Sequence, residues 1–438
     1  LKPFWLKCLK VDRSPVRIPA QRAKVWVACG GSGISTQARV EPRPPTLDAM
    51  ELKVTSKKGA SFYARAAADF LQGADARAAV DGKEAQEAKP PVDFMRITAL
   101  GDAIHIAVAV ATRIEADGLG EIMNVQTNYP IMPNGRTCSQ IIIRVKRKGA
   151  SFRVPLLQYT PFPSTNTKPR PVHVWLPDGY EADTERYAVL YMHDGQNLFE
   201  DSQAAFGTSW KAADALSALI KDGAARKTII VGVFNGEATR FREYIPGPVV
   251  ERLDSDTRDK LLAQPQYGGP PLSAGYVRFL VEELKPFIDK TYRTKPDRSN
   301  TFIMGSSMGG LISWYTLALH PDIFAGAGCV STHWPLSIDD DTLEKEAEGW
   351  RDTVCRAFRG YLEEVIPTAG KHRFWFDFGS KHLDAHYEPY QKVADGVFAA
   401  KGYKQGEDLI TKSYAGADHN EASWRDRVKE PFAFLLAP

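Results

Sequence analysis

The sequence predicts an α/β protein in which a larger C-terminal domain, built on a mostly parallel sheet, follows a smaller domain. Two observations predict this fold class. After residue 170, short apolar runs alternate with helical segments, and runs such as "TIIVGVF" are unbroken, as expected of strands covered on both faces. Between residues 50 and 148 the elements follow another order, β-α-β-α-β-β. At 438 residues, the chain is long enough for two separate cores.

The elements of the smaller domain follow from periodicity. Residues 1–47 show little pattern and end in "EPRPPT", so an irregular segment is expected before a domain at 48–150. Alternating stretches predict strands, and apolar residues at helical spacing before a glycine predict helices. In chain order these are a strand at 50–56, a helix at 60–73, a strand at 92–100, a helix at 101–118, and strands at 121–129 and 138–148 joined by the hairpin "PIMPNGRT".

The larger domain is predicted at 171–438. Residues 151–170, with the Pro-, Ser- and Thr-rich run "YTPFPSTNTKPRP", are expected to be a linker. Helices are expected between the strands, including 274–290 and 387–403. The predicted strands are 172–177, 187–194, 228–234, 300–306, 325–331, 372–379 and 408–416.

The composition excludes several classes of protein. Five cysteines lie without CxxC spacing, which argues against a zinc site and a disulfide framework and suits a reducing, cytoplasmic location. No apolar run approaches the roughly 18 residues of a membrane span, and "LKPFWLKCLK" lacks the apolar core of a signal peptide. A net charge of +3 is too small to indicate a nucleic-acid or membrane partner by itself.

The segment "TFIMGSSMGGLISWYTLALHP" contains a candidate nucleophile. Ser307 is the serine of a Gly-x-Ser-x-Gly pentapeptide between a predicted buried strand and a predicted helix. In that setting the serine occupies a strained turn that exposes its Oγ, while the flanking glycines avoid collisions between strand and helix. We therefore expect Ser307 to be a catalytic nucleophile. The alternative is a plain turn.

A nucleophilic serine needs a base and an acid, which in this strand-turn-helix context follow it along the chain in the order acid, histidine. His419 comes after the final strand, in a loop at the edge of the sheet where ligands bind in open α/β folds, so it is the expected base. Two candidate acids lie in this region: Asp377 near the end of the penultimate strand, and Asp384 in the loop beyond it. We favour Asp384, which lies in the loop, and expect Asp377 to be a structural cap.

The oxyanion of the reaction requires two preorganised donors. The backbone N–H of Met308, at the start of the helix after the nucleophile, is the first candidate. The second is the N–H of Gln196 in "YMHDGQNLF", where Gly195 allows a close turn. His193 and Asp194 are expected to scaffold this loop through mutual hydrogen bonds.

The segments "YAVLYMHDGQNLF", "FREYIPGP", "FIMGSSMGG", "FDFGSKHLDAHYEPYQ" and "GADHNEASW" together resemble the Putative esterase family of α/β-hydrolases, from about residue 164 to the C-terminus. That family groups esterase D with siderophore, feruloyl and acetylxylan esterases and with mycolyltransferases. The resemblance implies a carboxylic ester hydrolase that uses Ser307, His419 and Asp384, acts on a small-molecule ester and requires neither a cofactor nor a metal. Acyl transfer to an alcohol is the alternative reaction. Candidate pocket residues, which could equally be core aromatics, are Trp210, Arg242, Tyr244, His333 and Trp334.

The segments "KVTSKKGASFYARAAADFL", "RITALGDAIHIAVAVATRIEADGLGEIMNVQT" and "NGRTCSQIIIRVKR" resemble Alba-domain nucleic-acid-binding proteins. The resemblance implies that residues 48–150 bind RNA or DNA, with Lys57 and Lys58 at backbone phosphates and Arg136 at the tip of a hairpin arm. A scaffolding or dimerisation module is the alternative. For the whole chain, the alternative to an esterase is a nucleic-acid-binding protein whose hydrolase half is residual.

Overall fold

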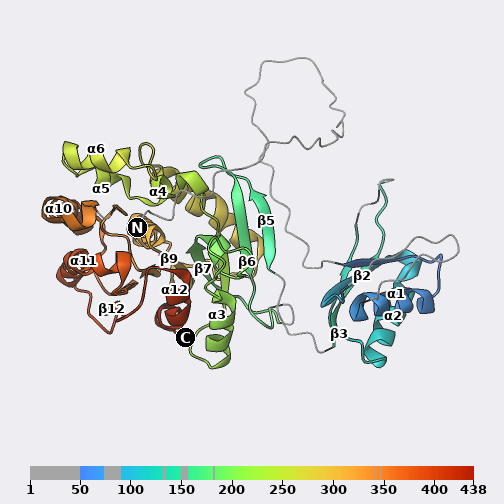
Figure 1. Ribbon diagram of the computed structural model, residues 1–438. Coiled ribbons are helices and arrows are strands. Elements are labelled where there is room, and N and C mark those ends of the chain that lie inside the picture. The colour runs from blue at the N-terminus through green and yellow to red at the C-terminus, as the bar shows by residue number, and fades with distance from the viewer. Residues whose placement is uncertain are drawn as a thin grey trace, which may run out of the picture. The chain divides into compact units, whose positions relative to one another are not determined.

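The described residues of the computed structural model contain two sheets, one of four strands and one of eight (Figure 1). The irregular segment expected at residues 1–47 lies outside the described residues. The structure describes residues 50–73, 90–130, 132, 135–148, 156–180, 183–339, 341–345 and 347–438.

The four-stranded sheet confirms the predicted order of elements in the smaller domain. Its strands lie in the order β1-β2-β4-β3; β1 and β2 are parallel, and the other pairs are antiparallel. The helices α1 and α2 lie together against one face, where Ile97, Ile143 and Val110 are almost fully buried (Figure 1). The elements are β1 (Glu51–Val54), α1 (Ala60–Gln72), β2 (Phe94–Leu100), α2 (Ile104–Ala116), β3 (Gly120–Asn128) and β4 (Gln140–Arg147).

The eight-stranded sheet is mostly parallel, as predicted. Its strands lie in the order β12-β11-β10-β9-β7-β8-β6-β5, and only the pairs β5–β6 and β6–β8 of this described sheet are antiparallel. Ligand sites of such sheets lie at the carboxyl ends of the parallel strands. The strands are β5 (Leu157–Phe162), β6 (Arg170–Trp175), β7 (Ala188–His193), β8 (Thr228–Val233), β9 (Thr301–Ser306), β10 (Gly326–Val330), β11 (Arg373–Phe378) and β12 (Leu409–Ser413).

Both faces of this sheet are covered, which explains the unbroken apolar runs. Along β9, Ile303 belongs to one core, and its neighbours Phe302 and Met304 belong to the other. The helices α9, α10 and α11 contribute to the first core, and α3 and α13 contribute to the second. Side chains that alternate between two faces are therefore apolar at every position of the strand.

The helices of the larger unit connect the strands. The helix predicted at 274–290 is divided into α7 (Ser273–Arg278), a π-helical turn (Phe279–Leu284) and α8 (Lys285–Thr291), because Pro286 has no N–H for the regular bond pattern. The other helices are α3 (Ala212–Lys221), α4 (Arg240–Tyr244), α5 (Gly247–Glu251), α6 (Ser255–Ala263), α9 (Met308–Leu319), α10 (Ala347–Val365), α11 (Glu388–Ala400), α12 (Glu421–Arg427) and α13 (Lys429–Leu435).

The predicted linker at 151–170 is wrong for residues 157–162, because these form β5, which pairs with β6. Leu157, Tyr159 and Phe162 are buried in the first core of the large sheet. A register shift lies between Tyr159 and Phe162, and the intervening Pro161 is exposed. An edge strand tolerates a proline, which cannot donate to the ladder.

Candidate active site

Ser307 lies in a strained turn between β9 and α9. Its φ of 59° and ψ of −123° lie outside the regions usual for residues with a side chain. Its N–H donates to Val330 O at 2.9 Å, and its side chain is 9% exposed. A Cβ on Gly305 would lie 2.9 Å from the backbone of Gly309, so strand and helix meet here without room for a methyl group. The predicted steric reason for a glycine is therefore confirmed at Gly305.

Asp384 and His419 form a short hydrogen bond. His419 Nδ1 donates to Asp384 Oδ1 at 2.6 Å, and the other carboxylate oxygen accepts from Ser331 Oγ and from Gly379 N–H, each at 2.6 Å. Asp384 is 1% exposed. Burial raises the pKa of Asp384, but the hydrogen bonds and the nearby His419 outweigh it and hold that pKa below its ordinary value. The carboxylate is therefore ionised and fixed against the imidazole.

Asp377 has other partners. Its Oδ1 accepts from Arg427 Nη2 at 2.9 Å and from the backbone N–H of Ser331 at 3.1 Å, and its Oδ2 accepts from Trp375 Nε1 at 2.7 Å. It is fully buried beneath the loop that carries Ser331. The structure thus places Asp384, and not Asp377, against His419.

The loops of Ser307 and His419 meet through His333 and Tyr387. The N–H of His333 donates to Ser307 O at 3.1 Å. The hydroxyl of Tyr387 lies 2.8 Å from His333 Nδ1 and 3.4 Å from His419 Nδ1. Among the described residues, no hydrogen bond joins Ser307 Oγ to His419. Such bonds are often long in the absence of substrate and tighten when it binds.

The two expected oxyanion donors come from neighbouring backbone segments. Met308 is the first residue of α9, where N–H groups have no acceptor within the helix. Gln196 lies in η3 (Gly195–Asn197), a short 3₁₀ turn after β7. A Cβ on Gly309 would lie 3.3 Å from His193 Cβ, so the two segments touch. Asn197 Nδ2 also donates to Glu421 Oε1 at 3.0 Å, which joins this turn to the His419 loop.

The expected mutual hydrogen bonds of His193 and Asp194 are wrong. His193 Nδ1 pairs with Tyr276 OH at 2.8 Å, whereas Asp194 binds Arg240 and Asn235. Burial, together with nearby arginines, lowers the pKa of His193 to about 3. His193 is therefore a neutral, buried support of the loop. The pairs could not be predicted because Arg240 follows β8, and sequence alone does not place β8 beside β7.

Three of the five candidate pocket residues are buried aromatic side chains. Trp210 (3% exposed) packs in the core at 5.7 Å from Trp424, and Trp334 (1% exposed) donates to Gln391 from the core. Tyr244 is fully buried.

The other two pocket candidates are polar. Arg242 is partly exposed and donates to Pro270 O at 2.7 Å, whereas His333 is buried beside Ser307. Burial, followed by the charges of His419 and Arg240, lowers the pKa of His333 to about 3. Tyr387, which joins His333 to His419, was not predicted as a site residue. Nothing in the sequence around Tyr387 indicates that contact.

In the smaller unit, Lys57 and Lys58 are exposed in the turn before α1. The Nζ of Lys58 lies 5.6 Å from the ring centre of Phe62, whose side chain is 58% exposed. Arg136 is exposed in the hairpin between β3 and β4, as predicted; Met132 N–H donates to its carbonyl at 2.8 Å. The two lysines and Arg136 are therefore at the surface of this unit.

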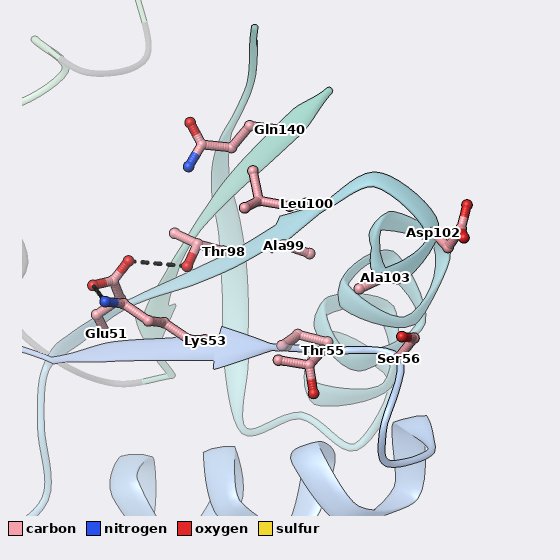
Figure 2. Close-up of a pocket in the computed structure, with 11 residues that line it drawn as sticks. Glu51, Lys53, Thr55, Ser56, Thr98, Ala99, Leu100, Asp102, Ala103 and Gln140 are labelled. Carbon is pink, nitrogen blue, oxygen red and sulfur yellow. Dashed lines mark hydrogen bonds and ion pairs between the residues drawn. The ribbon is translucent and has the colours of Figure 1, made fainter. Parts of the chain in front are cut away.

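A cavity of about 620 Å³ is lined by residues along β1 and by the last residues of β2 (Figure 2). Lys53 and Ser56 line it together with Glu51 and Asp102. Thr98 Oγ1 donates to Glu51 Oε1 at 2.9 Å along its wall. One lysine is balanced by two carboxylates, so the lining itself does not select an anion.

The described part of the chain contains neither a membrane-spanning helix nor a cluster of metal-ligating side chains. No helix among those residues is long and apolar enough to cross a bilayer. Nor does this part contain three or more His, Cys, Asp or Glu side chains grouped so as to hold a metal ion.

Curated relatives match parts of the chain. It is 29% identical over 157 residues to the ferri-bacillibactin esterase BesA of Bacillus subtilis, covering 34% of this chain and 49% of that protein. It is 27% identical over 196 residues to an endo-1,4-beta-xylanase/feruloyl esterase of Xylanibacter ruminicola, covering 43% and 23%. A third relative, the endonuclease ALBA3 of Plasmodium falciparum, is 33% identical over 78 residues, covering 18% and 62%. The chain therefore spans less than two thirds of each of these relatives.

Solved structures and a family model cover more of the chain. An enterobactin esterase structure from Shigella flexneri is similar with a TM-score of 0.47 at 13% identity, over 70% of this chain and 66% of that one. The sequence model of the family described as Putative esterase matches residues 164–432, which is more than half of the chain and includes Ser307, Asp384 and His419. The chain therefore belongs to the Putative esterase family.

Proposed function

We propose that the protein is a serine carboxylic ester hydrolase that works through Ser307, His419 and Asp384. The observation that carries the proposal is the 2.6 Å hydrogen bond between His419 Nδ1 and buried Asp384, in a loop joined to the Ser307 turn. Membership of the Putative esterase family supports an ester as the substrate class. If the pair of Asp384 and His419 were purely structural, the strained conformation of Ser307 on the adjoining turn would have no explanation.

The hydrogen bond to Asp384 sets the chemistry of His419. With Nδ1 protonated and donating, Nε2 carries the lone pair and acts as the general base. His419 takes the Ser307 proton as Oγ attacks the ester carbonyl, and the N–H groups of Met308 and Gln196 stabilise the oxyanion. His419 then protonates the leaving alcohol. In the second half, His419 deprotonates a water molecule that releases the acid from the acyl-enzyme.

The proposed substrate is a small-molecule carboxylic ester. The names of two relatives, a feruloyl esterase and a ferri-bacillibactin esterase, support esters of this kind. Acyl transfer would differ only in the second half, where an alcohol replaces water. Product analysis with added methanol as acceptor separates the two reactions, because a transferase would yield the methyl ester in preference to the free acid.

The test is hydrolysis of p-nitrophenyl acetate by the full chain and by Ser307→Ala. We expect kcat to fall at least about 10³-fold, while the thermal unfolding midpoint stays within a few degrees of the parent. A fluorophosphonate probe should label the parent and not the variant. Equal rates in the two proteins would contradict the proposal.

A second proposed function, nucleic-acid binding, belongs to residues 48–150. It is supported by the exposed Lys57 and Lys58 at the open N-terminus of α1, where no side chain caps the helix, and by the partial likeness to ALBA3. Exposed Phe62, next to Lys58, offers a ring on which an unpaired base can stack. The alternative is a dimerisation surface, for which Val108 on α2 is 43% exposed.

Filter binding to single-stranded RNA and duplex DNA across a salt series tests this second function. If the two lysines meet phosphates, affinity falls with salt, and Lys57→Ala/Lys58→Ala lowers both the affinity and the salt slope. The matched control is Lys392→Ala on α11, an exposed lysine of the esterase unit. No retention by the parent at low salt excludes the function, and a dimer in sedimentation would then favour the alternative.

A further inference from the structure

Asp194 directs the backbone toward the second oxyanion donor. It follows β7 with φ 54° and ψ 49°, a left-handed conformation that is unfavourable for most residues with a side chain. The turn η3 starts directly after it, and Asn197 N–H donates to Asp194 O at 2.9 Å. The angles of Asp194 therefore set where the N–H of Gln196 points.

Both carboxylate oxygens of Asp194 are held by residues that follow β8. Arg240 donates from Nε to Oδ1 at 2.7 Å and from Nη2 to Oδ2 at 2.8 Å, which is the two-pronged geometry of a guanidinium on a carboxylate. Asn235 Nδ2 adds a bond to Oδ1 at 2.7 Å. Burial raises the pKa of Asp194, but Arg240 outweighs it and keeps the carboxyl ionised. The side chains are 9% (Asp194) and 20% (Arg240) exposed.

Arg240 is itself immobilised. Its guanidinium lies over the rings of Phe241 and Tyr244, 5.7 and 5.3 Å from their centres, at the start of α4. Such contacts favour a fixed arginine and are not reproduced by lysine. The Asp194 carboxylate is therefore held by an arginine that is itself fixed in place.

The turn is also confined from two other directions. A Cβ on Gly195 would lie 2.6 Å from the backbone of Gly232, and one on Gly309 would lie 3.4 Å from Asp194 Oδ2. The turn therefore sits between β8 and the first residues of the nucleophile helix. A rotation of Asp194 would move Gln196 relative to Met308, the other expected donor.

We propose that Arg240 is a positioning residue of the oxyanion hole, which acts through Asp194 to hold the N–H of Gln196 toward the developing oxyanion. The inference rests on the proposed function. It assigns a role to Arg240, whereas the guanidinium of the pocket candidate Arg242 binds Pro270 O. Donors placed for the oxyanion stabilise the transition state more than the bound ester, so loss of position should lower kcat and leave KM nearly unchanged.

The experiment compares Arg240→Gln, Arg240→Lys and Asp194→Asn with the parent in hydrolysis of p-nitrophenyl acetate. We expect Arg240→Gln and Asp194→Asn to lower kcat about 10- to 100-fold with KM within twofold, and Arg240→Lys to retain part of the activity. Inhibition by phenylboronic acid, whose tetrahedral serine adduct uses the same donors, should weaken by a factor similar to the fall in kcat. The double variant should lose no more than either single variant, because both act through one pair.

The control is Arg252→Gln, which removes a surface pair with Glu364 and should change neither kcat nor boronate inhibition. Thermal melting followed by circular dichroism identifies any variant that fails to fold. If Arg240→Gln fails to fold, Arg240→Lys is compared with the parent instead. An unchanged kcat in a folded Arg240→Gln, or a raised KM at constant kcat, overturns this inference alone. A parent without Ser307-dependent turnover overturns the proposed function and this inference with it.

Discussion

Asp377, within β11, and Asp384, in the turn after β11, are predicted to differ in what they do. Asp384→Asn allows His419 to adopt the wrong tautomer, since an amide can donate to Nδ1 where the carboxylate accepts from it. We expect kcat for p-nitrophenyl acetate to fall roughly 10³- to 10⁴-fold with KM little changed. Stopped-time assays at high enzyme concentration measure the residual activity of the variant. A loss below tenfold would show that Asp384 is not the acid.

Asp377→Asn is the matched comparison. It breaks a fully buried pair with Arg427, a change that typically costs roughly 3–5 kcal/mol, but it leaves the bond between Asp384 and His419 in place. The expected result is a lower urea midpoint, with kcat within about tenfold at a temperature where the variant is folded. A fully stable variant would contradict the structural role of the pair.

At the residue scale, the sequence predicted what depends on local pattern. The glycine-flanked turn between an apolar strand and a helix predicts Ser307 as the nucleophile, and the position after the last strand predicts His419 as the base. The position of Asp384 in a loop favours it over Asp377 as the acid, and the structure places Asp384 Oδ1 2.6 Å from His419 Nδ1. Arg240 was not predictable, because its partner Asp194 lies 46 positions away and is reached only through the pairing of β7 with β8.

At the scale of elements, the junction of β9 and α9 is predicted to be intolerant of added volume. Gly305→Ala places a methyl group 2.9 Å from backbone atoms of Gly309, which cannot rotate away. We expect a destabilisation of about 1–3 kcal/mol and a lower kcat, because the turn that carries Ser307 must shift. Urea unfolding and p-nitrophenyl acetate kinetics measure the two effects.

A glycine in an open helix provides the control. A Cβ on Gly360, within α10, would meet nothing within 4 Å. Gly360→Ala should therefore stabilise the protein by about 0.5–1 kcal/mol without a change in kcat. If Gly305→Ala and Gly360→Ala changed the stability equally, helix propensity, and not close packing, would govern both positions.

The elements themselves were largely predictable because their periodicity is local. Every strand expected after residue 171 is present within a few residues of its predicted ends. β5 was missed, since Pro161 and the surrounding polar residues are typical of a linker, and only pairing with β6 makes the segment a strand. The division of the 274–290 helix follows from Pro286, but a π-helical turn has no simple sequence signal.

For the whole molecule, buried histidines predict sensitivity to acid. Burial lowers the pKa of His173 to about 4 and, with nearby positive charges, those of His193 and His333 to about 3, from an ordinary 6.5. Because the folded-state values are depressed, unfolding takes up protons below pH 6.5. The stabilisation is complete above that pH and is lost as the pH falls toward 3. Each histidine then accounts for about 2 kcal/mol of lost stability at pH 5.

Urea unfolding at pH 7 and pH 5 measures this loss. His173→Asn, distant from Ser307 on β6, removes one titrating group and should reduce the difference between the two pH values by about 2 kcal/mol. If His173→Asn and the parent lost the same stability between pH 7 and pH 5, the protons taken up on unfolding would bind to other groups.

The hydrogen bond between Asn197 and Glu421 spans 224 positions of the chain. A growing polypeptide on the ribosome exposes the first of these residues long before the second is synthesised. The groups around Ser307 can therefore assemble only after Glu421 has been synthesised, so we expect a product truncated before Glu421 to show no Ser307-dependent turnover.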